Sequence, residues 1–215
     1  KGETFSLVGE SGCGKSTIAS LLMGNNKADT GMVSIGGVDV NDIADAALYK
    51  KITRVRHDSY LFKGTVADNL KMGKPNASEQ EMIAALRKVD MFDTIMEKGG
   101  LLMQIEEKAS NLSGGQKQRL VLARAILHDS DIYIFDEATS NIDVESEDRI
   151  MQVVQELAEN KLVILISHRL ANVVKADQIY VVEKGSIVEE GKHCELLEKN
   201  GTVTVCHSRT QNLSE

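Results

Sequence analysis

Short apolar segments alternate with helical patterns along most of the chain, and this alternation indicates the architecture. The segments that read as buried strands are Glu3–Val8, Ile52–Val55, Asp131–Phe135 and Leu162–Ile166. Helices are predicted over residues 15–23 and 145–160, between such strands. Turn residues at Gly36-Gly37 and Lys184-Gly185 predict two hairpins. Strands and helices in this order imply an α/β fold, in which a mostly parallel sheet is covered on both faces.

The pattern becomes helical between residues 66 and 127. A capping-box pattern at Ser78 and Glu81 predicts the start of one helix there. A Ser-Gly-Gly turn at Ser113 predicts the start of another. The expected parts are an α/β core at 1–65 and 128–200, an inserted α-helical subdomain at 66–127 and a polar tail at 201–215.

Composition and charge exclude several classes of protein. Hydrophobic residues make up 42% of the chain and charged residues 27%, which is ordinary for a globular domain. The formal net charge of −7 argues against direct nucleic-acid binding. The longest apolar run, Leu162–Ile166, is too short to cross a bilayer. The cysteines at 13, 194 and 206 have no framework spacing, which fits a reducing cytosol.

A glycine-rich loop follows the first predicted strand and precedes the first helix. The segment Gly9-Glu10-Ser11-Gly12-Cys13-Gly14-Lys15-Ser16 fits the pattern G-x-x-x-x-G-K-[ST]. Backbone N–H groups of such a loop converge on phosphate oxygens, and the helix N-terminus adds positive potential. We expect Lys15 to reach the β- and γ-phosphates, Ser16 to bind Mg²⁺ and Thr17 to contact the α-phosphate. The alternative is an ordinary glycine-rich turn.

Polar side chains also follow two later strands. Asp136 and Glu137 end the strand that begins at Asp131, and His168 follows the strand Leu162–Ile166. Because parallel strands place their carboxyl ends at one edge of a sheet, these side chains are expected near the phosphate loop. Asp136 would hold Mg²⁺ and Glu137 would orient or deprotonate a water molecule. A solvent-facing acidic strand end and a structural histidine are the alternatives.

A second anion-binding loop is predicted at Asn111-Leu112-Ser113-Gly114-Gly115-Gln116. Ser113, Gly114, Gly115 and Gln116 stand at the start of a helix, where free N–H groups and the helix dipole favour an anion. The alternative is a capped helix start without a ligand.

These motifs together resemble the ATP-binding domain of ABC transporters. Gly9–Thr17 is similar to the Walker A motif of that family, Asn111–Gln116 to its signature and Asp136-Glu137 to its Walker B motif. Ser140-Asn141-Ile142-Asp143 is similar to the D-loop, and His168 to the switch histidine. The segments Leu61–Leu70 and Ile166–Leu170 resemble the exporter branch of the family.

The resemblance implies a P-loop NTPase fold and an Mg²⁺-dependent ATPase that powers an exporter. It implies a head-to-tail dimer, in which ATP lies between the Walker A loop of one domain and the signature of the other, with Asp143 also among the nucleotide-binding residues. The remaining partner would be a transmembrane domain, placing the chain at the cytoplasmic face of the cell membrane. Lys1 is not a start methionine, so we expect N-terminal strands and any membrane domain to lie upstream.

Two other functions remain open. One is a soluble ABC-type ATPase of translation, DNA maintenance or iron–sulfur assembly, although residues 18–110 leave no room for the coiled coil of DNA-maintenance relatives. The other is a hydrolysis-impaired nucleotide-binding module, which His57 alone suggests. Intact Glu137 and His168 argue against it.

His57 departs from the family pattern because it stands where the Q-loop glutamine is expected. A glutamine offers an amide oxygen to Mg²⁺, whereas neutral histidine offers one ring nitrogen and protonated histidine offers none. We expect weaker metal coordination or coupling, with a steeper loss of activity below about pH 6.5. A tolerated substitution is the alternative. The adenine-stacking aromatic residue of the family is expected upstream of Lys1.

Overall fold

The computed structural model describes residues 2–140, 142–168 and 170–198. The chain forms two compact units, each built from segments distant in sequence. The core unit contains the described residues of the ranges 2–54, Asp131–Glu137 and 158–198. The helical unit contains Val55–Ser130 and Ala138–Leu157. The predicted helical subdomain, residues 66–127, lies within the helical unit, which also includes a later helix.

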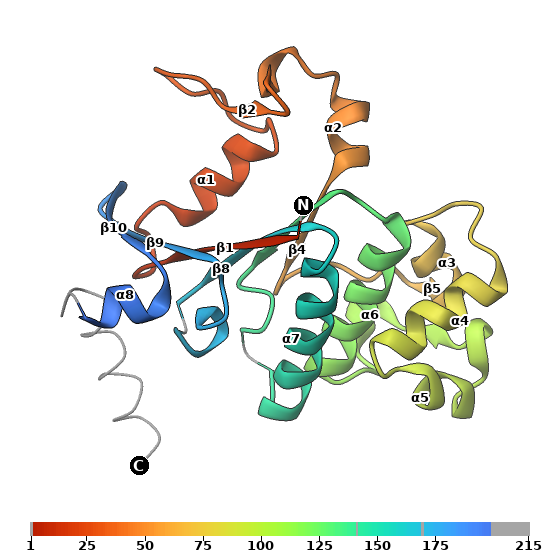
Figure 1. Ribbon diagram of the computed structural model, residues 1–215. Helices are drawn as coiled ribbons and strands as arrows, with labels where there is room; N and C mark the ends of the chain where they lie inside the picture. The colour runs from red at the N-terminus through yellow and green to blue at the C-terminus, as the bar shows by residue number, and fades with distance from the viewer. Residues whose placement is uncertain (1, 141, 169, 199–215) are drawn as a thin grey trace. The chain divides into compact units, whose positions relative to one another are not determined.

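A six-stranded sheet has the strand order β10-β9-β1-β8-β7-β4 (Figure 1). Its strands are β1 (Glu3–Val8), β4 (Ile52–Arg56), β7 (Ile132–Asp136), β8 (Leu162–Ser167), β9 (Gln178–Glu183) and β10 (Ser186–Gly191). Strand β1 runs parallel to β8 and β9, and β7 runs parallel to β8. Strand β10 pairs with β9 in the antiparallel direction. The predicted α/β fold with a mostly parallel sheet is therefore confirmed.

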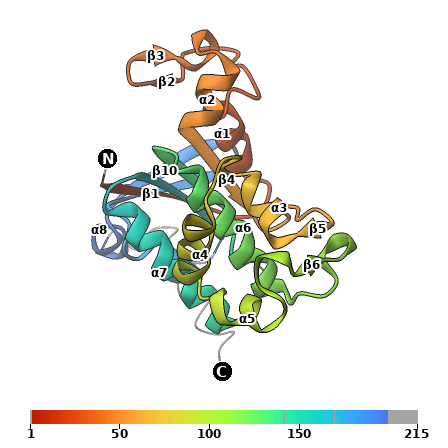
Figure 2. The ribbon, with the colours of Figure 1, turned by 90° about the vertical axis from the view of Figure 1, so that its right-hand side faces the viewer.

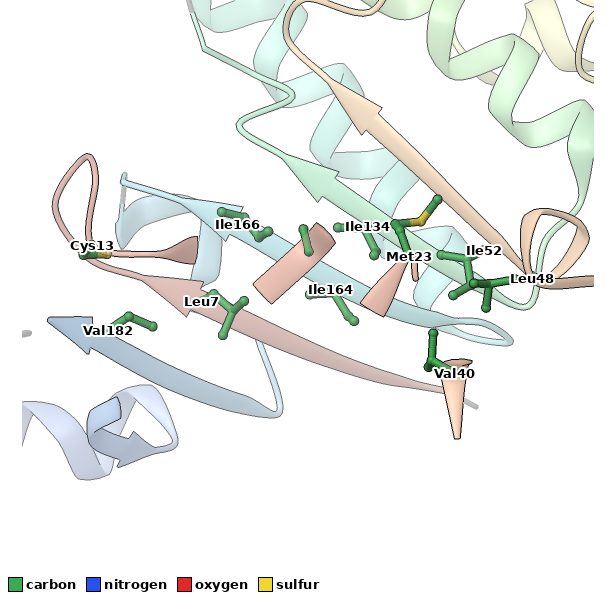
Figure 3. Packing of buried hydrophobic residues seen from close by; sticks show 11 residues of the cluster. Leu7, Cys13, Met23, Val40, Leu48, Ile52, Ile134, Ile164, Ile166 and Val182 are labelled. Carbon is green, nitrogen blue, oxygen red and sulfur yellow. The ribbon is translucent and has the colours of Figure 1, made fainter. Parts of the chain in front are cut away.

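Helix α1 (Lys15–Leu22) packs on one face of this sheet. Ala19 and Met23 contribute to a buried cluster with Leu7 of β1, Ile134 of β7 and Ile164 of β8 (Figure 3). The alternation of side chains along each strand brings these apolar groups to the same face. Their burial holds α1, and with it the preceding loop, against the sheet.

The other described elements of the core unit are short. The hairpin expected at Gly36-Gly37 is formed by β2 (Ser34–Ile35) and β3 (Val38–Asp39). No sequence pattern predicted the remaining ones, which are η1 (Val40–Asp42), α2 (Asp45–Lys51), η4 (Leu170–Val173) and α8 (His193–Glu198). Elements this short span only one or two turns, so they carry little periodicity.

The helical unit is dominated by five helices, of which α3 to α6 gather together in Figure 2. They are α3 (Val66–Lys71), α4 (Glu79–Lys88), α5 (Phe92–Glu97), α6 (Gly114–His128) and α7 (Val144–Ala158). The connecting elements are β5 (Gly64–Thr65), η2 (Gly100–Leu102), β6 (Gln104–Ile105) and η3 (Glu107–Ala109). The predicted capping box of α4 is present, since Ser78 accepts from the N–H of Glu81 and Glu81 accepts from the N–H of Ser78. The polar tail predicted at 201–215 lies outside the described residues.

Candidate nucleotide-binding site

The glycine-rich loop between β1 and α1 is tied to the neighbouring strand β9. Gly9 has a φ of 154°, and a Cβ atom there would lie 2.2 Å from the carbonyl oxygen of Val182 and 2.8 Å from Cys13 Sγ. Gly185 N–H, in the β9–β10 turn, donates to the carbonyl oxygen of Cys13 at 2.9 Å. The loop therefore needs glycine at its first position, because a side chain would force it off β9.

Lys15 is folded over this loop. Its side chain is 5% exposed, and Nζ donates to the carbonyl oxygens of Gly9 and Glu10 at 2.8 Å each. Nζ also lies 3.6 Å from Cys13 Sγ. A buried ammonium group satisfied by loop carbonyls can exchange those weak acceptors for phosphate oxygens.

The start of α1 has no side-chain cap and no acidic residue in its first turn. Gly14 precedes the helix with a φ of 109°, which a residue with a side chain rarely adopts. Ser16 and Thr17 are exposed at this helix end. The arrangement combines open N–H donors, the helix dipole and an exposed hydroxyl, which is the chemistry that binds a phosphate.

The carboxyl ends of three parallel strands meet beside the loop, as the sequence analysis predicted. Leu7 pairs with Ile166, and Ile166 pairs with Asp136, so β1, β8 and β7 end at one level. Gly9, His168 and Glu137 follow these strands directly. Gly9 and His168, which are 159 positions apart, are thereby brought to one sheet edge, where ligands of open α/β sheets bind.

Asp136 is buried at the end of β7, with its side chain 6% exposed. Its Oδ2 atom accepts a hydrogen bond from Nη2 of Arg54, the middle residue of strand β4, and the two side chains form an ion pair. Burial of the carboxylate is tolerated because of this partner. The predicted alternative of a solvent-facing acidic strand end is wrong for Asp136.

Glu137 has an unusual backbone conformation. Its φ is 50°, which few non-glycine residues adopt, and its N–H donates to the carbonyl oxygen of Ile166 at 2.9 Å. This hydrogen bond to β8 holds Glu137 in the left-handed region. Strained residues of this kind cluster at functional sites.

Glu137 and His168 face each other across the sheet edge. His168 Nδ1 lies 3.7 Å from Glu137 Oε1, with the side chains 48% and 29% exposed respectively. This separation is an electrostatic contact rather than a hydrogen bond. Both groups are accessible to a ligand in front of the strands.

The donors for a metal ion are oxygen atoms. The Ser16 hydroxyl and the Asp136 carboxylate are hard ligands of the type that Mg²⁺ prefers. Among the described residues, no cluster of three or more His, Cys, Asp or Glu side chains is arranged to hold a metal. Phosphate oxygens and water would therefore have to complete a coordination shell built on these two groups.

The predicted second anion loop lies in the helical unit. Ser113 Oγ accepts from the N–H of Gln116 at 3.2 Å, and Gln116 Oε1 accepts from the N–H of Ser113 at 3.1 Å. These bonds form a capping box, so the alternative of a capped helix start is realised here. Ser113 and Gly114 are exposed at this helix end, whereas Gly115 is buried.

Gly115 brings this loop against the segment that carries Asp143. A Cβ atom on Gly115 would lie 2.1 Å from Ser146 Oγ and 3.0 Å from Asp143 Oδ2. The N–H of Ser146 donates to Asp143 Oδ1 at 2.8 Å, and this bond lowers the pKa of the Asp143 carboxyl. The buried Gly115 thus packs the start of α6 against the segment with the exposed Asp143, whereas Asn141 lies outside the described residues.

His57 is exposed in a turn of the helical unit, whereas Ser16 and Asp136 belong to the core unit. The turn is closed by the N–H of Ser59, which donates to the carbonyl oxygen of Arg56 at 3.1 Å. Gln118 of α6 donates to the same carbonyl at 3.0 Å. The predicted metal-binding role of His57 therefore stays a prediction.

Sequence reasoning missed Arg54, Gln118 and Ser146. A signal for the first two was present, because Arg54 is a charge inside a predicted apolar strand and Gln118 stands on the apolar face of α6. Ser146 carried no local signal, since its importance comes from contact with Gly115.

Among residues 2–140, 142–168 and 170–198, no helix has both the length and the apolar character required to cross a membrane.

Comparison with known proteins identifies relatives over almost the whole chain. The family model described as ABC transporter matches residues 1–140. A Haemophilus influenzae protein named "Uncharacterized ABC transporter ATP-binding protein" is 47% identical over 208 residues, which are 97% of this chain and 37% of that protein. The Vibrio vulnificus "ATP-dependent lipid A-core flippase" is 42% identical over 210 residues, covering 96% of this chain and 36% of the flippase.

A solved structure of a bacterial Atm1-family ABC exporter with ATP bound superposes with a TM-score of 0.91 at 33% identity. The match covers 97% of this chain and 37% of the exporter chain. The chain thus spans little more than a third of the length of the relatives it matches. The likeness confirms the predicted P-loop NTPase fold, and with the family match over residues 1–140 it establishes that the chain belongs to the ABC transporter family, as an ATP-binding domain of the exporter type.

Proposed function

We propose that this chain binds and hydrolyses ATP with Mg²⁺ and thereby drives transport by an exporter. The observation that carries the proposal is the meeting of Lys15, Asp136, Glu137 and His168 at one edge of the sheet. The match to an ATP-bound exporter structure supports it, as does the similarity to a protein named as a flippase.

In the proposed binding step, the triphosphate lies along the loop Gly9–Ser16. Lys15 Nζ leaves the carbonyl oxygens of Gly9 and Glu10 and donates to the β- and γ-phosphates. The N–H groups at the start of α1 bind the remaining phosphate oxygens. Ser16 and Asp136 would hold Mg²⁺, which, when bound, offsets the negative charge of the β- and γ-phosphates.

In the proposed hydrolysis step, a water oxygen attacks the γ-phosphorus and the bond to the β-phosphate oxygen breaks. Glu137 orients this water and accepts its proton. His168, 3.7 Å from Glu137, contacts the γ-phosphate and keeps the carboxylate in place. Lys15 stabilises the charge on the transferred phosphoryl group.

We further propose that the loop at Ser113 acts on the nucleotide of a second copy or of a related domain. Its glycine backbone at the start of α6 provides the N–H groups for a γ-phosphate. Asp143 lies beside it and would contact the opposing domain. The partners proposed are this second ATPase domain and a transmembrane domain, with the chain at the cytoplasmic face of the membrane.

The decisive experiment on catalysis uses Glu137→Gln in the complete protein. This variant should bind ATP normally, lose turnover by about a hundredfold or more and accumulate as a nucleotide-bound dimer. Glu183→Gln, which removes a carboxylate at the end of strand β9 of the same sheet, is the matched control and should retain full turnover. Steady hydrolysis by Glu137→Gln would exclude Glu137 as the base.

The proposed dimer is tested by crosslinking two exposed loop residues. Ser11→Cys and Ser113→Cys, combined in one protein, should crosslink between copies when ATP is present and hydrolysis is blocked. Each single variant controls for the native Cys13. Absence of an ATP-dependent crosslink would exclude the head-to-tail arrangement. It would not exclude ATP binding, which is measured separately.

A further inference from the structure

Arg54 places a buried positive charge next to the carboxylate assigned to Mg²⁺. Strand β4, which carries Arg54, is at the edge of the sheet and neighbours β7, which ends at Asp136. The side chains of Arg54 and Asp136 are 14% and 6% exposed. The surrounding positions of β4, Ile52 and Val55, are apolar and buried. Thr53 and Arg54 therefore lie between two buried apolar positions, where removal of a charge from water has to be offset by a partner.

The geometry of the pair is not the one that maximises stability. Only Nη2 of Arg54 contacts Oδ2 of Asp136, and the buried Nε atom has no acceptor among the described residues. A strong arginine–carboxylate pair is bidentate and uses two parallel hydrogen bonds. An unsatisfied buried donor is a cost. The pair thus holds Asp136 with a single bond that another cation can replace.

A second ion pair, formed by the residues directly before the same two strands, provides a comparison. Lys51, just before β4, pairs with Asp131, just before β7, at 2.5 Å. These side chains are 61% and 28% exposed, so their pair is solvated. Only the Arg54 pair lies at the carboxyl edge of the sheet with the phosphate loop. Variants of the two pairs can therefore distinguish the effect of a charge at the candidate site from the effect of an exposed charge beside the same strands.

A guanidinium group and Mg²⁺ compete for one carboxylate. Arginine remains charged at every pH the protein meets, so the competition cannot be relieved by losing a proton. We propose that Arg54 is a positioning residue that holds Asp136 in the metal-free state and must give up this contact when Mg²⁺ binds with the nucleotide. Arg54 then sets the metal concentration that the site requires. This inference rests on the proposed function.

The test measures binding of Mn²⁺, a paramagnetic substitute for Mg²⁺, to the complete protein with a non-hydrolysable ATP analogue. Loss of the free Mn²⁺ signal in electron paramagnetic resonance gives the half-saturating concentration. Arg54→Leu should lower that concentration about tenfold, because a competing cation is removed from a partly buried site. Arg54→Lys, which keeps the charge, and Lys51→Leu, which removes the exposed cation, should stay within about twofold of the parent protein.

The outcomes separate this inference from the proposed function. If the parent protein binds no Mn²⁺ with the analogue, the proposed function fails. If the parent protein binds Mn²⁺ and Arg54→Leu binds it equally or more weakly, only the role of Arg54 fails. If Lys51→Leu gained as much affinity for Mn²⁺ as Arg54→Leu, the role of Arg54 would also be overturned, since the gain would then come from the change in overall charge.

A second measurement covers the case in which Arg54→Leu does not fold. In protein labelled with ¹⁵N-arginine, the Nε–H signal of Arg54 is identified by its absence from Arg54→Lys. This signal should shift when the analogue and Mg²⁺ are added together, and it should stay in place when the analogue is added with a chelator. A signal that is unchanged by Mg²⁺ would show that the ion pair persists, and would overturn the proposal.

Discussion

Gln118 Nε2 donates a hydrogen bond of 3.0 Å to the carbonyl oxygen of Arg56, so the helix that begins at the Ser113 loop also holds the residue before His57. Farther along the same helix, Arg124 Nη1 donates to the carbonyl oxygen of Tyr60 at 2.9 Å. Both ends of the turn that carries His57 are therefore attached to α6. A change in position of the Ser113 loop would be transmitted to His57 through this helix.

Gln118→Leu is expected to loosen this turn. The change removes one of two hydrogen bonds to the carbonyl of Arg56, which still accepts from the N–H of Ser59, and should lower the free energy of unfolding by about 0.5–1.5 kcal/mol. Amide hydrogen exchange of residues 57–60 should become faster. Gln80→Leu, at an exposed position of α4, should change stability by no more than about 0.5 kcal/mol. Unchanged exchange in Gln118→Leu would mean that the turn is held by its own hydrogen bonds.

Gly115→Ala should disturb the contact between α6 and α7. The new Cβ atom would lie 2.1 Å from Ser146 Oγ and 2.6 Å from Ser146 Cβ, so the helices must separate. Urea unfolding should show a loss of about 1–3 kcal/mol. Ser146→Gly removes both clashing atoms. In the Ser146→Gly background, Gly115→Ala should therefore lower the free energy of unfolding far less than it does in the parent protein. Strictly additive effects would refute the contact.

His57→Gln should raise ATP turnover of the complete transporter. Glutamine offers an amide oxygen at every pH, whereas protonated histidine has no acceptor. Turnover of the variant, measured at saturating ATP, should therefore exceed turnover of the parent protein. Equal turnover would favour a tolerated substitution.

Glu81 should contribute to stability in a defined acidic window. Hydrogen bonds from Lys74 and Ser78 lower the pKa of the Glu81 carboxyl from 4.5 to about 2. Because the folded-state pKa is depressed, the stabilisation is present above pH 4.5 and is lost as the pH falls toward about 2. Glu81→Gln should flatten the dependence of melting temperature on pH in that range.

The control for Glu81 is Glu79→Gln, on the same first turn of α4. It should leave the pH dependence of the parent protein in place. If both variants lose the same slope, general charge rather than the capping box is responsible.

The elements that local patterns predict are those that local interactions create. The strands β1, β7 and β8 each begin and end within one residue of the predicted bounds, because each is a short segment rich in apolar residues and bounded by polar or turn residues. The capping box of α4 involves residues only three positions apart. The loop at Gly9–Ser16 was predictable for the same reason, since its conformation depends on adjacent glycines.

Contacts between distant segments were decided by the tertiary structure. Arg54 meets Asp136 only because β4 neighbours β7 in the sheet order, and no local pattern contains that order. Gly115 meets Ser146 only because α7 joins the helical unit, whereas the sequence pattern had assigned its residues to the core. Strand order and helix packing depend on burial summed over the whole chain, so they cannot be derived from the spacing of residues within one segment.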